Sequence, residues 1–138
     1  DTQGLVALLE RAAPLINASG IIIWILDPSG RELRPALGYG YPPQALARMG
    51  SIPRDADNAT AAAYRVAEMQ TVRSEGGAPG AIVAPLIATA NCVGVMTAEV
   101  RGGSESREPI QALATIVATQ LAGFVAAAPP AEAAQAHG

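Results

Sequence analysis

The chain has 138 residues, which suits one domain and leaves no room for two of ordinary size. Half of the residues are apolar, but 30 of these are alanine, so we expect a core of small aliphatic side chains. Nine arginines, no lysine and twelve acidic residues give a net charge of -3, and only one Trp, three Tyr and one Phe are present. This balance argues against a nucleic-acid partner, which would need a basic surface with rings for base stacking.

One cysteine excludes a disulfide framework and a thiolate zinc site, and the single histidine, His137, stands near the end of the chain. Residues 129–138 hold no aliphatic side chain larger than alanine, which predicts a linker or terminal tail after one domain over residues 1–128. From Asp1 onward no basic segment precedes an apolar stretch, so no signal peptide is predicted. We expect a cytoplasmic domain that is part of a longer protein.

The first predicted element, within residues 1–18, is an amphipathic helix from Thr2 to Asn17, because its leucines recur at helical spacing. Gly20 to Asp27 is rich in β-branched residues and ends in the turn sequence Asp-Pro-Ser-Gly. A second run from Arg31 to Gly38 follows, which predicts a hairpin. Both faces of the first strand are apolar, so we place it centrally in a sheet that is covered on both sides.

Farther along the chain, Gln44 to Met49 predicts a short helix, and Asp57-Asn58 is a suitable cap for a helix from Ala61 to Met69. Ala81 to Ala88 and Cys92 to Val100 flank a short turn, which predicts a second hairpin. Glu108-Pro109 then opens a last helix within residues 107–128. This order predicts an α+β fold, in which residues 19–100 form an antiparallel sheet with its capping helices and both terminal helices lie on one face.

Alternation along the last strand predicts which of its side chains share a face. One set has small members and is expected to lie beneath the terminal helices: Cys92, Gly94, Met96 and Ala98. The opposite set is expected to point toward the other side of the sheet: Val93, Val95, Thr97 and Glu99.

The last helix contains a long apolar segment, Ala112 to Ala128, which resembles a membrane span in length. Its larger side chains, however, recur every three or four residues along one face, which favours a buried or oligomeric helix and no membrane contact. The apolar stripes on the two terminal helices exceed what one sheet face needs. We therefore expect a homodimer with contacts from Leu5, Leu8, Ile110, Leu113, Val117, Leu121 and Phe124.

Several segments together resemble the GAF domain family, which includes ligand-binding and regulatory domains of phosphodiesterases, bacterial cyclases, transcriptional regulators and sensor kinases. The resemblance spans about Ser19 to Val125. The segments that carry it are the hairpin Ile22 to Leu37, the exit Gly38-Tyr-Gly-Tyr-Pro, the helix end Ala63-Tyr-Arg-Val-Ala-Glu-Met-Gln, the strand Ala84-Pro-Leu-Ile and Cys92-Val-Gly-Val-Met. It implies a five- or six-stranded antiparallel sheet with a pocket capped by the middle helices. A PAS-like or profilin-like sandwich is the structural alternative, which strand order would distinguish.

The specialised branches of this family need residues that the chain lacks. Bilin attachment uses a pocket Cys with Asp-Ile-Pro and a nearby His, whereas this chain has Ser51-Ile-Pro. The cyclic-nucleotide branch uses a lysine, and the methionine-sulfoxide-reducing branch uses several cysteines. Haem and iron sensors need His or carboxylate clusters, and we interpret Asp55 and Asp57 as turn and cap residues. We therefore expect no bilin, haem, metal or other cofactor and no catalytic residues.

The segment that would cap the family's pocket contains most of the aromatic residues and several fixed hydrogen-bond donors, which suits a small polar or anionic ligand. Trp24 could stack on such a ligand, although packing in the core with its N–H bonded is the favoured interpretation. The other candidates could equally be ordinary loop and helix-surface residues. The complete candidate ligand-binding set is Trp24, Tyr39, Tyr41, Arg48, Arg54, Asn58, Thr60, Tyr64 and Glu99.

Two functional hypotheses follow for a non-catalytic module. The first is a sensory or regulatory domain that binds an unidentified small molecule, dimerises through its terminal helices, and controls an attached output domain. The second is a degenerate GAF domain that serves only as a dimerisation scaffold and has no ligand. An enzymatic function is disfavoured, because the chain contains no set of nucleophile, base and orienting group.

Overall fold

The computed structural model describes residues 2–127, so the tail predicted at 129–138 lies outside the described residues. The chain forms a curled antiparallel sheet of six strands in the order β3-β2-β1-β6-β5-β4. The elements are α1 (Thr2–Leu15), β1 (Ala18–Leu26), β2 (Glu32–Tyr39), α2 (Pro43–Arg48), β3 (Ile52–Pro53), α3 (Ala59–Val66), β4 (Gln70–Val72), β5 (Gly80–Ala88), β6 (Asn91–Val100), a 3₁₀ turn (Ser104–Ser106) and α4 (Glu108–Ala127).

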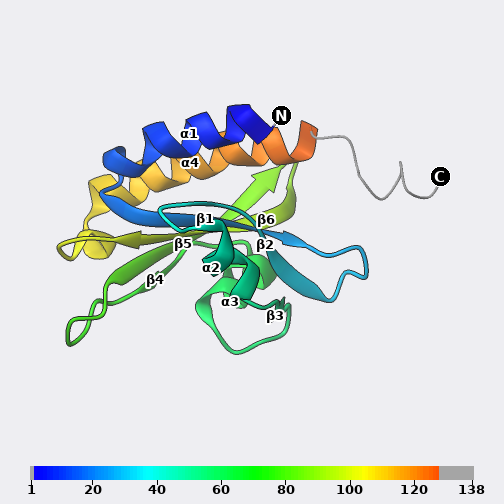
Figure 1. Cartoon of the computed structure of the whole chain (residues 1–138), viewed down its shortest axis with the longest axis horizontal. Helices are drawn as coiled ribbons and strands as arrows, with labels where there is room; N and C mark the ends of the chain where they lie inside the picture. Colours follow the sequence, from blue (N-terminus) through cyan, green and yellow to red (C-terminus); the bar gives the residue numbers. More distant parts are fainter. Residues whose placement is uncertain (1, 128–138) are drawn as a thin grey trace.

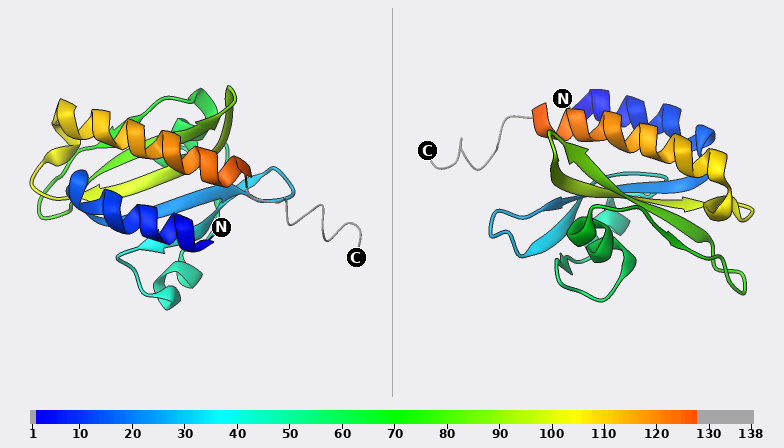
Figure 2. Two further views of the ribbon diagram at one scale, coloured as in Figure 1. Left: turned by 90° about the horizontal axis from the view of Figure 1, so that it is seen from above. Right: turned by 180° about the vertical axis from the view of Figure 1, so that it is seen from behind.

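The helices occupy two layers. In Figure 1, α1 and α4 lie above the sheet, whereas α2 and α3 lie below it. Figure 2 shows α1 and α4 side by side and antiparallel across the sheet, so that the start of α1 and the end of α4 are at the same end of the molecule. The predicted α+β class and the separation of the terminal helices from the middle helices are confirmed.

The core beneath α1 and α4 is the larger of two. It joins the inward stripes of both helices to one face of β1, β5 and β6, with Leu9, Ile21, Met96 and Leu121 at most 1% exposed. Alanines at positions 114, 118 and 122 allow α4 to lie close to the sheet, because a small side chain keeps the helix axis near the strands. The alanine-rich composition is therefore used for close layer packing.

The second core lies on the other face of the sheet, which we call the α2/α3 face. Its buried members are Ile22, Trp24, Leu33, Ala63, Val83 and Val95. Leu46 from α2 and Tyr64 from α3 pack against them. Because β1 contributes to both cores, its two faces are covered, as its apolar sequence predicted.

The predicted alternation of side chains between the two faces of the sheet is confirmed along most of β6. Met96 and Ala98 face the terminal helices and Val95 faces α2 and α3, as predicted. The prediction for Val93 was wrong, because this residue packs against the helix-side core. The pairing of β5 and β6 shifts register between Leu86 and Ile87, and such a bulge reverses the face of the residues beyond it.

Local boundaries follow from capping and turn chemistry. Asn58 caps α3 as predicted, since its Oδ1 accepts a hydrogen bond of 2.9 Å from the backbone N–H of Ala61. The helix ends at Val66 and not at Met69, because Ala67 adopts a left-handed conformation with φ of 56°. The β5–β6 hairpin turns at Thr89 and Ala90, both with positive φ, which is the backbone of a type I′ turn. The short edge strands β3 and β4 were not predicted.

Candidate functional site

The candidate ligand residues must be compared with the α2/α3 face, where the family's pocket is expected. Trp24 is only 6% exposed there and donates its indole N–H to Thr97 Oγ1 at 3.0 Å. The ring is therefore part of the second core with its polar atom bonded. This confirms the core interpretation of Trp24 and corrects the expectation that it stacks on a ligand.

Tyr41 and Glu99 lie together at one end of this face. The Tyr41 hydroxyl donates a short hydrogen bond to Glu99 Oε1, and burial together with this bond raises the pKa of the phenol well above its ordinary value. The tyrosine ring rests on Gly20 of β1, where a Cβ atom would stand 2.6 Å from ring atoms. Gly20 therefore makes room for the ring, which covers this end of β1.

Tyr39 does not share this position. It ends β2 opposite Ile21 of β1, and both residues belong to the core beneath the terminal helices. The backbone then reverses at Gly40, with φ of 84°, before it reaches Tyr41. The expectation that Tyr39 and Tyr41 line one pocket is therefore wrong, because the turn sends the two rings to opposite faces of the sheet.

The remaining candidates mainly hold the β3–α3 connection in place. The Arg54 guanidinium lies 5.3 Å from the centre of the Tyr64 ring and donates to the Gly30 carbonyl at 3.0 Å. Asn58 is used as the cap of α3. Thr60 is half-buried in the first turn of α3, and Arg48 is exposed in the last turn of α2, where its charge complements the helix dipole.

The best-formed hollows on residues 2–127 lie mostly away from these side chains. Five of these hollows have volumes from about 180 to about 590 Å³. Of the nine candidates, Arg54 alone lines one of them, an open polar hollow beside the β1–β2 turn. The structure thus brings Trp24, Tyr41, Tyr64 and Glu99 to the expected face but packs them as its covering.

The predicted dimer contacts divide into buried and accessible residues. Leu8, Val117 and Leu121 are 8%, 4% and 0% exposed because they bind the terminal helices to the sheet. The assignment of Val117 and Leu121 to a dimer surface is therefore wrong, whereas Leu8 also lines a surface groove. Leu5, Ile110 and Leu113 are partly buried against the same core. Of the predicted contacts, Phe124 is the exposed large apolar side chain, at 37%.

Residues outside the predicted dimer contacts give the terminal helices an apolar outer surface. Leu15 and Ile116 are 57% and 55% exposed, and Val6 is 37% exposed. No charged residue occurs from Pro109 to Ala127. By length and composition α4 could cross a membrane, but its inner stripe packs on the sheet.

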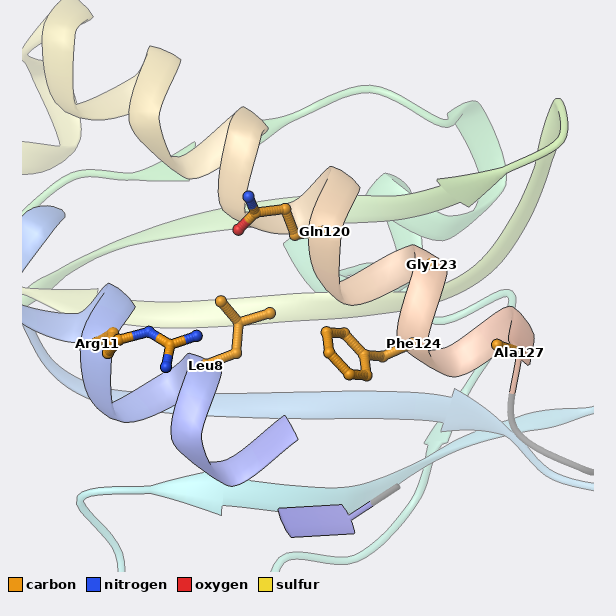
Figure 3. A pocket seen from close by; sticks show the side chains of 6 residues that line it. All are labelled: Leu8, Arg11, Gln120, Gly123, Phe124 and Ala127. Atoms are coloured by element: carbon orange, nitrogen blue, oxygen red, sulfur yellow. The ribbon is translucent and has the colours of Figure 1, made fainter. Parts of the chain in front are cut away.

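A groove of about 490 Å³ runs between α1 and α4 near the chain ends. Figure 3 shows Phe124 pointing from α4 into this groove toward Leu8 of α1. Arg11 and Gln120 also line it, and Gly123 leaves its α4 side open. The predicted dimer contacts included Leu8 and Phe124 of this groove but not Arg11, Gln120 or Gly123, because the prediction selected only the large apolar side chains.

The Cys92 thiol and the Glu105 carboxylate lie outside the surfaces described above. Cys92 is half-buried and donates its thiol to the Gly94 carbonyl at 3.3 Å, and burial raises the pKa of the thiol. Glu105 was missed by sequence analysis, although it is 4% exposed and accepts hydrogen bonds at Oε2 from the backbone and hydroxyl of Ser74.

Within residues 2–127, no group of three or more His, Cys, Asp or Glu side chains could hold a metal ion.

A family model described as the GAF domain matches residues 3–123. The chain belongs to the GAF domain family. Comparison with curated protein sequences gave no match. Among solved structures, the second GAF domain of DevS from Mycobacterium smegmatis is similar over 96% of this chain and 95% of that one, with 24% identity and a TM-score of 0.68.

Two further structures show how widely the fold is used. The GAF domain of a phosphoenolpyruvate-protein phosphotransferase from Coxiella burnetii gives a TM-score of 0.74 at 14% identity, over 90% of this chain and 81% of that one. A type II free methionine-R-sulfoxide reductase from Thermoplasma acidophilum gives 0.69 at 13% identity, over 90% of both chains. GAF domains are generally sensory or regulatory modules, and the reductase shows that the fold also supports an enzyme.

Proposed function

We propose that this GAF domain is a non-catalytic, intracellular regulatory module that acts as a homodimer through the outer surface of α1 and α4 and controls an attached output domain. The observation that carries the proposal is the outer surface of α4. The helix has no charged residue from Pro109 to Ala127. Ile116 and Phe124 are 55% and 37% exposed on its outer surface. Exposed apolar side chains on a helix of this length favour a protein partner.

A second copy of the chain is the partner that best fits this surface. A twofold axis beside α4 would bring each copy's Ile116 and Phe124 against the other copy's α4, which carries no charged residue from Pro109 to Ala127 and so contributes no unpaired buried charge. The start of α1 and the end of α4 lie at the same end of the molecule, so flanking segments of both copies would leave from the paired helices. A change in helix pairing would thus reach an output domain directly.

The packed α2/α3 face supports the scaffold hypothesis over ligand binding at the family's usual position. Trp24 has its N–H bonded, and Tyr41 with Glu99 covers the end of β1. A ligand on this face would have to displace these side chains and break their hydrogen bonds. We therefore assign regulation to the helix surface and not to a pocket between the sheet and α3.

Enzymatic function is also disfavoured by the chemistry of the described residues. The one cysteine, Cys92, has a raised pKa, whereas a catalytic thiol needs a lowered one. It also has no second cysteine that could resolve a covalent intermediate. We therefore do not propose for this chain the free methionine-R-sulfoxide reductase activity of the protein from Thermoplasma acidophilum.

The test replaces Ile116 by glutamate and measures molar mass by light scattering across protein concentrations. Wild type should be dimeric, and I116E should raise the dimer dissociation constant by about 100-fold or more, because two buried carboxylates would face an apolar contact. The matched control is V66E on α3, since Val66 is 54% exposed but lies on the opposite layer. A monomeric wild type, or an I116E protein that dimerises as tightly as V66E, would reject the proposal.

A further inference from the structure

The groove between α1 and α4 restricts what kind of surface can enter it. Phe124 points across the groove toward Leu8 (Figure 3), and Arg11 is the one charged residue of its lining. Gly123 leaves the α4 side open, since a Cβ atom placed on it would meet nothing within 4 Å. A helix that lies in this groove must therefore carry apolar side chains and no charge opposite Leu8 and Phe124.

Two exposed apolar side chains continue the groove away from the chain ends. Leu15 stands seven residues, or two turns, after Leu8 on α1, about 10.5 Å along the helix axis. Ile116 stands eight residues before Phe124 and one turn before Gln120 on α4, about 12 Å from Phe124 along the axis. The two helices run antiparallel (Figure 2), so Leu15 and Ile116 lie at about the same level, as Leu8 and Phe124 do.

The helix that matches this pattern is α4 of a second copy. It has no charged residue from Pro109 to Ala127, and its exposed large side chains, Ile116 and Phe124, are spaced as the apolar pairs along the groove are. We infer that the two α4 helices of the proposed dimer are parallel and in register, each lying in the other copy's groove, an inference that rests on the proposed function. The partner copy's Phe124 then packs against Leu8, and its Ile116 packs against Leu15.

The polar residues of the groove favour this arrangement over an antiparallel one. Antiparallel α4 helices would pair Ile116 with the partner copy's Phe124 only with the twofold axis at the level of Gln120. Arg11 lies at about that level, so the two arginines would face each other as like charges. In the parallel dimer each Arg11 instead donates to the amide oxygen of the partner copy's Gln120. Among residues 2–127, neither side chain forms another hydrogen bond or ion pair.

Disulfide cross-linking tests the orientation. Gly123 stands two turns after Ile116 on one line of α4, so a parallel pair places it opposite its own counterpart. In a C92S background, G123C should form a covalent dimer on oxidation, whereas V66C on α3 should not. An antiparallel pair would instead join I116C to F124C in a mixture of these two variants and leave G123C monomeric, which overturns the inference. A monomeric wild type by light scattering overturns the proposed function as well, so the two failures are distinguishable.

Mixing R11A with Q120A tests the bond between copies. Each homodimer lacks both bonds, whereas the heterodimer keeps one, because the Arg11 of one copy meets the Gln120 of the other. If one such bond changes the association constant about tenfold, heterodimers should make up about nine tenths of all dimers at equilibrium, measured by native mass spectrometry. A random mixture contains about half, and that result overturns the assignment of the bond to the interface, since a bond within one copy gives no such preference.

Discussion

Glu105 and Gly80 form a packed pair whose disruption should be measurable. A Cβ atom at Gly80 would stand closer than 3.0 Å to three atoms of the Glu105 carboxylate group. Neither the Gly80 backbone nor the Glu105 carboxylate can move freely. Gly80 is paired with Val100 of β6, and the carboxylate is held by the backbone and hydroxyl of Ser74 at 3.0 and 3.1 Å. G80A should therefore displace the carboxylate from Ser74 or shift the end of β5.

The expected cost of G80A is about 2 to 3 kcal/mol, the upper part of the range for overpacking, because both neighbours are fixed. The midpoint of thermal unfolding should fall by about 8 to 12 °C for a domain of this size. Urea unfolding followed by the fluorescence of Trp24, the single tryptophan, measures the free energy. In an E105A background the same glycine substitution should cost less than about 0.5 kcal/mol, because the obstructing group is gone.

Additive effects in this double-mutant cycle would refute the reasoning, since they would show that the alanine Cβ is strained by the backbone and not by the carboxylate. Acid titration adds a second check. Hydrogen bonding from Ser74, with a smaller contribution from Arg73, lowers the pKa of Glu105 below its ordinary value. Its stabilising effect is therefore complete above the unfolded pKa and is lost as pH falls through the folded one, so wild type and E105Q should converge in acid.

Three further predictions concern other contacts. Because burial and a carboxylate partner raise the pKa of Tyr41, the stability advantage of wild type over Y41F should be constant below about pH 10 and shrink above it, measured by urea unfolding. Replacing Thr89-Ala90 by Asn-Gly should stabilise the protein by about 1 kcal/mol in the same assay, because both positions have positive φ; unchanged stability would contradict the turn assignment. T97V should cost about 1 to 3 kcal/mol by leaving the indole N–H of Trp24 without its acceptor, whereas W24F combined with T97V should recover part of that loss.

The sequence pattern predicted helices and strands well where a single requirement, such as burial of both strand faces or capping of a helix start, decided the structure. The wholly apolar first strand predicted a central position with both faces covered, and Asn58 predicted the start of α3 through its capping oxygen. Failures occurred where a single backbone angle changed the pattern. Gly40 separates Tyr39 from Tyr41, and the left-handed Ala67 ends α3 one turn early. Alanine gives no sequence signal for a left-handed conformation, because that region favours glycine.

The candidate site was harder to predict. The sequence shows which segment contains the polar and aromatic residues, but it does not show whether their side chains line a pocket. Tyr41, Tyr64 and Glu99 do lie at the expected face, yet as a covering rather than a lining. Glu105 gave no signal, since a buried carboxylate is recognised only with the Ser74 and Gly80 that surround it in space. A helical stripe likewise cannot show whether its residues serve the sheet or a partner.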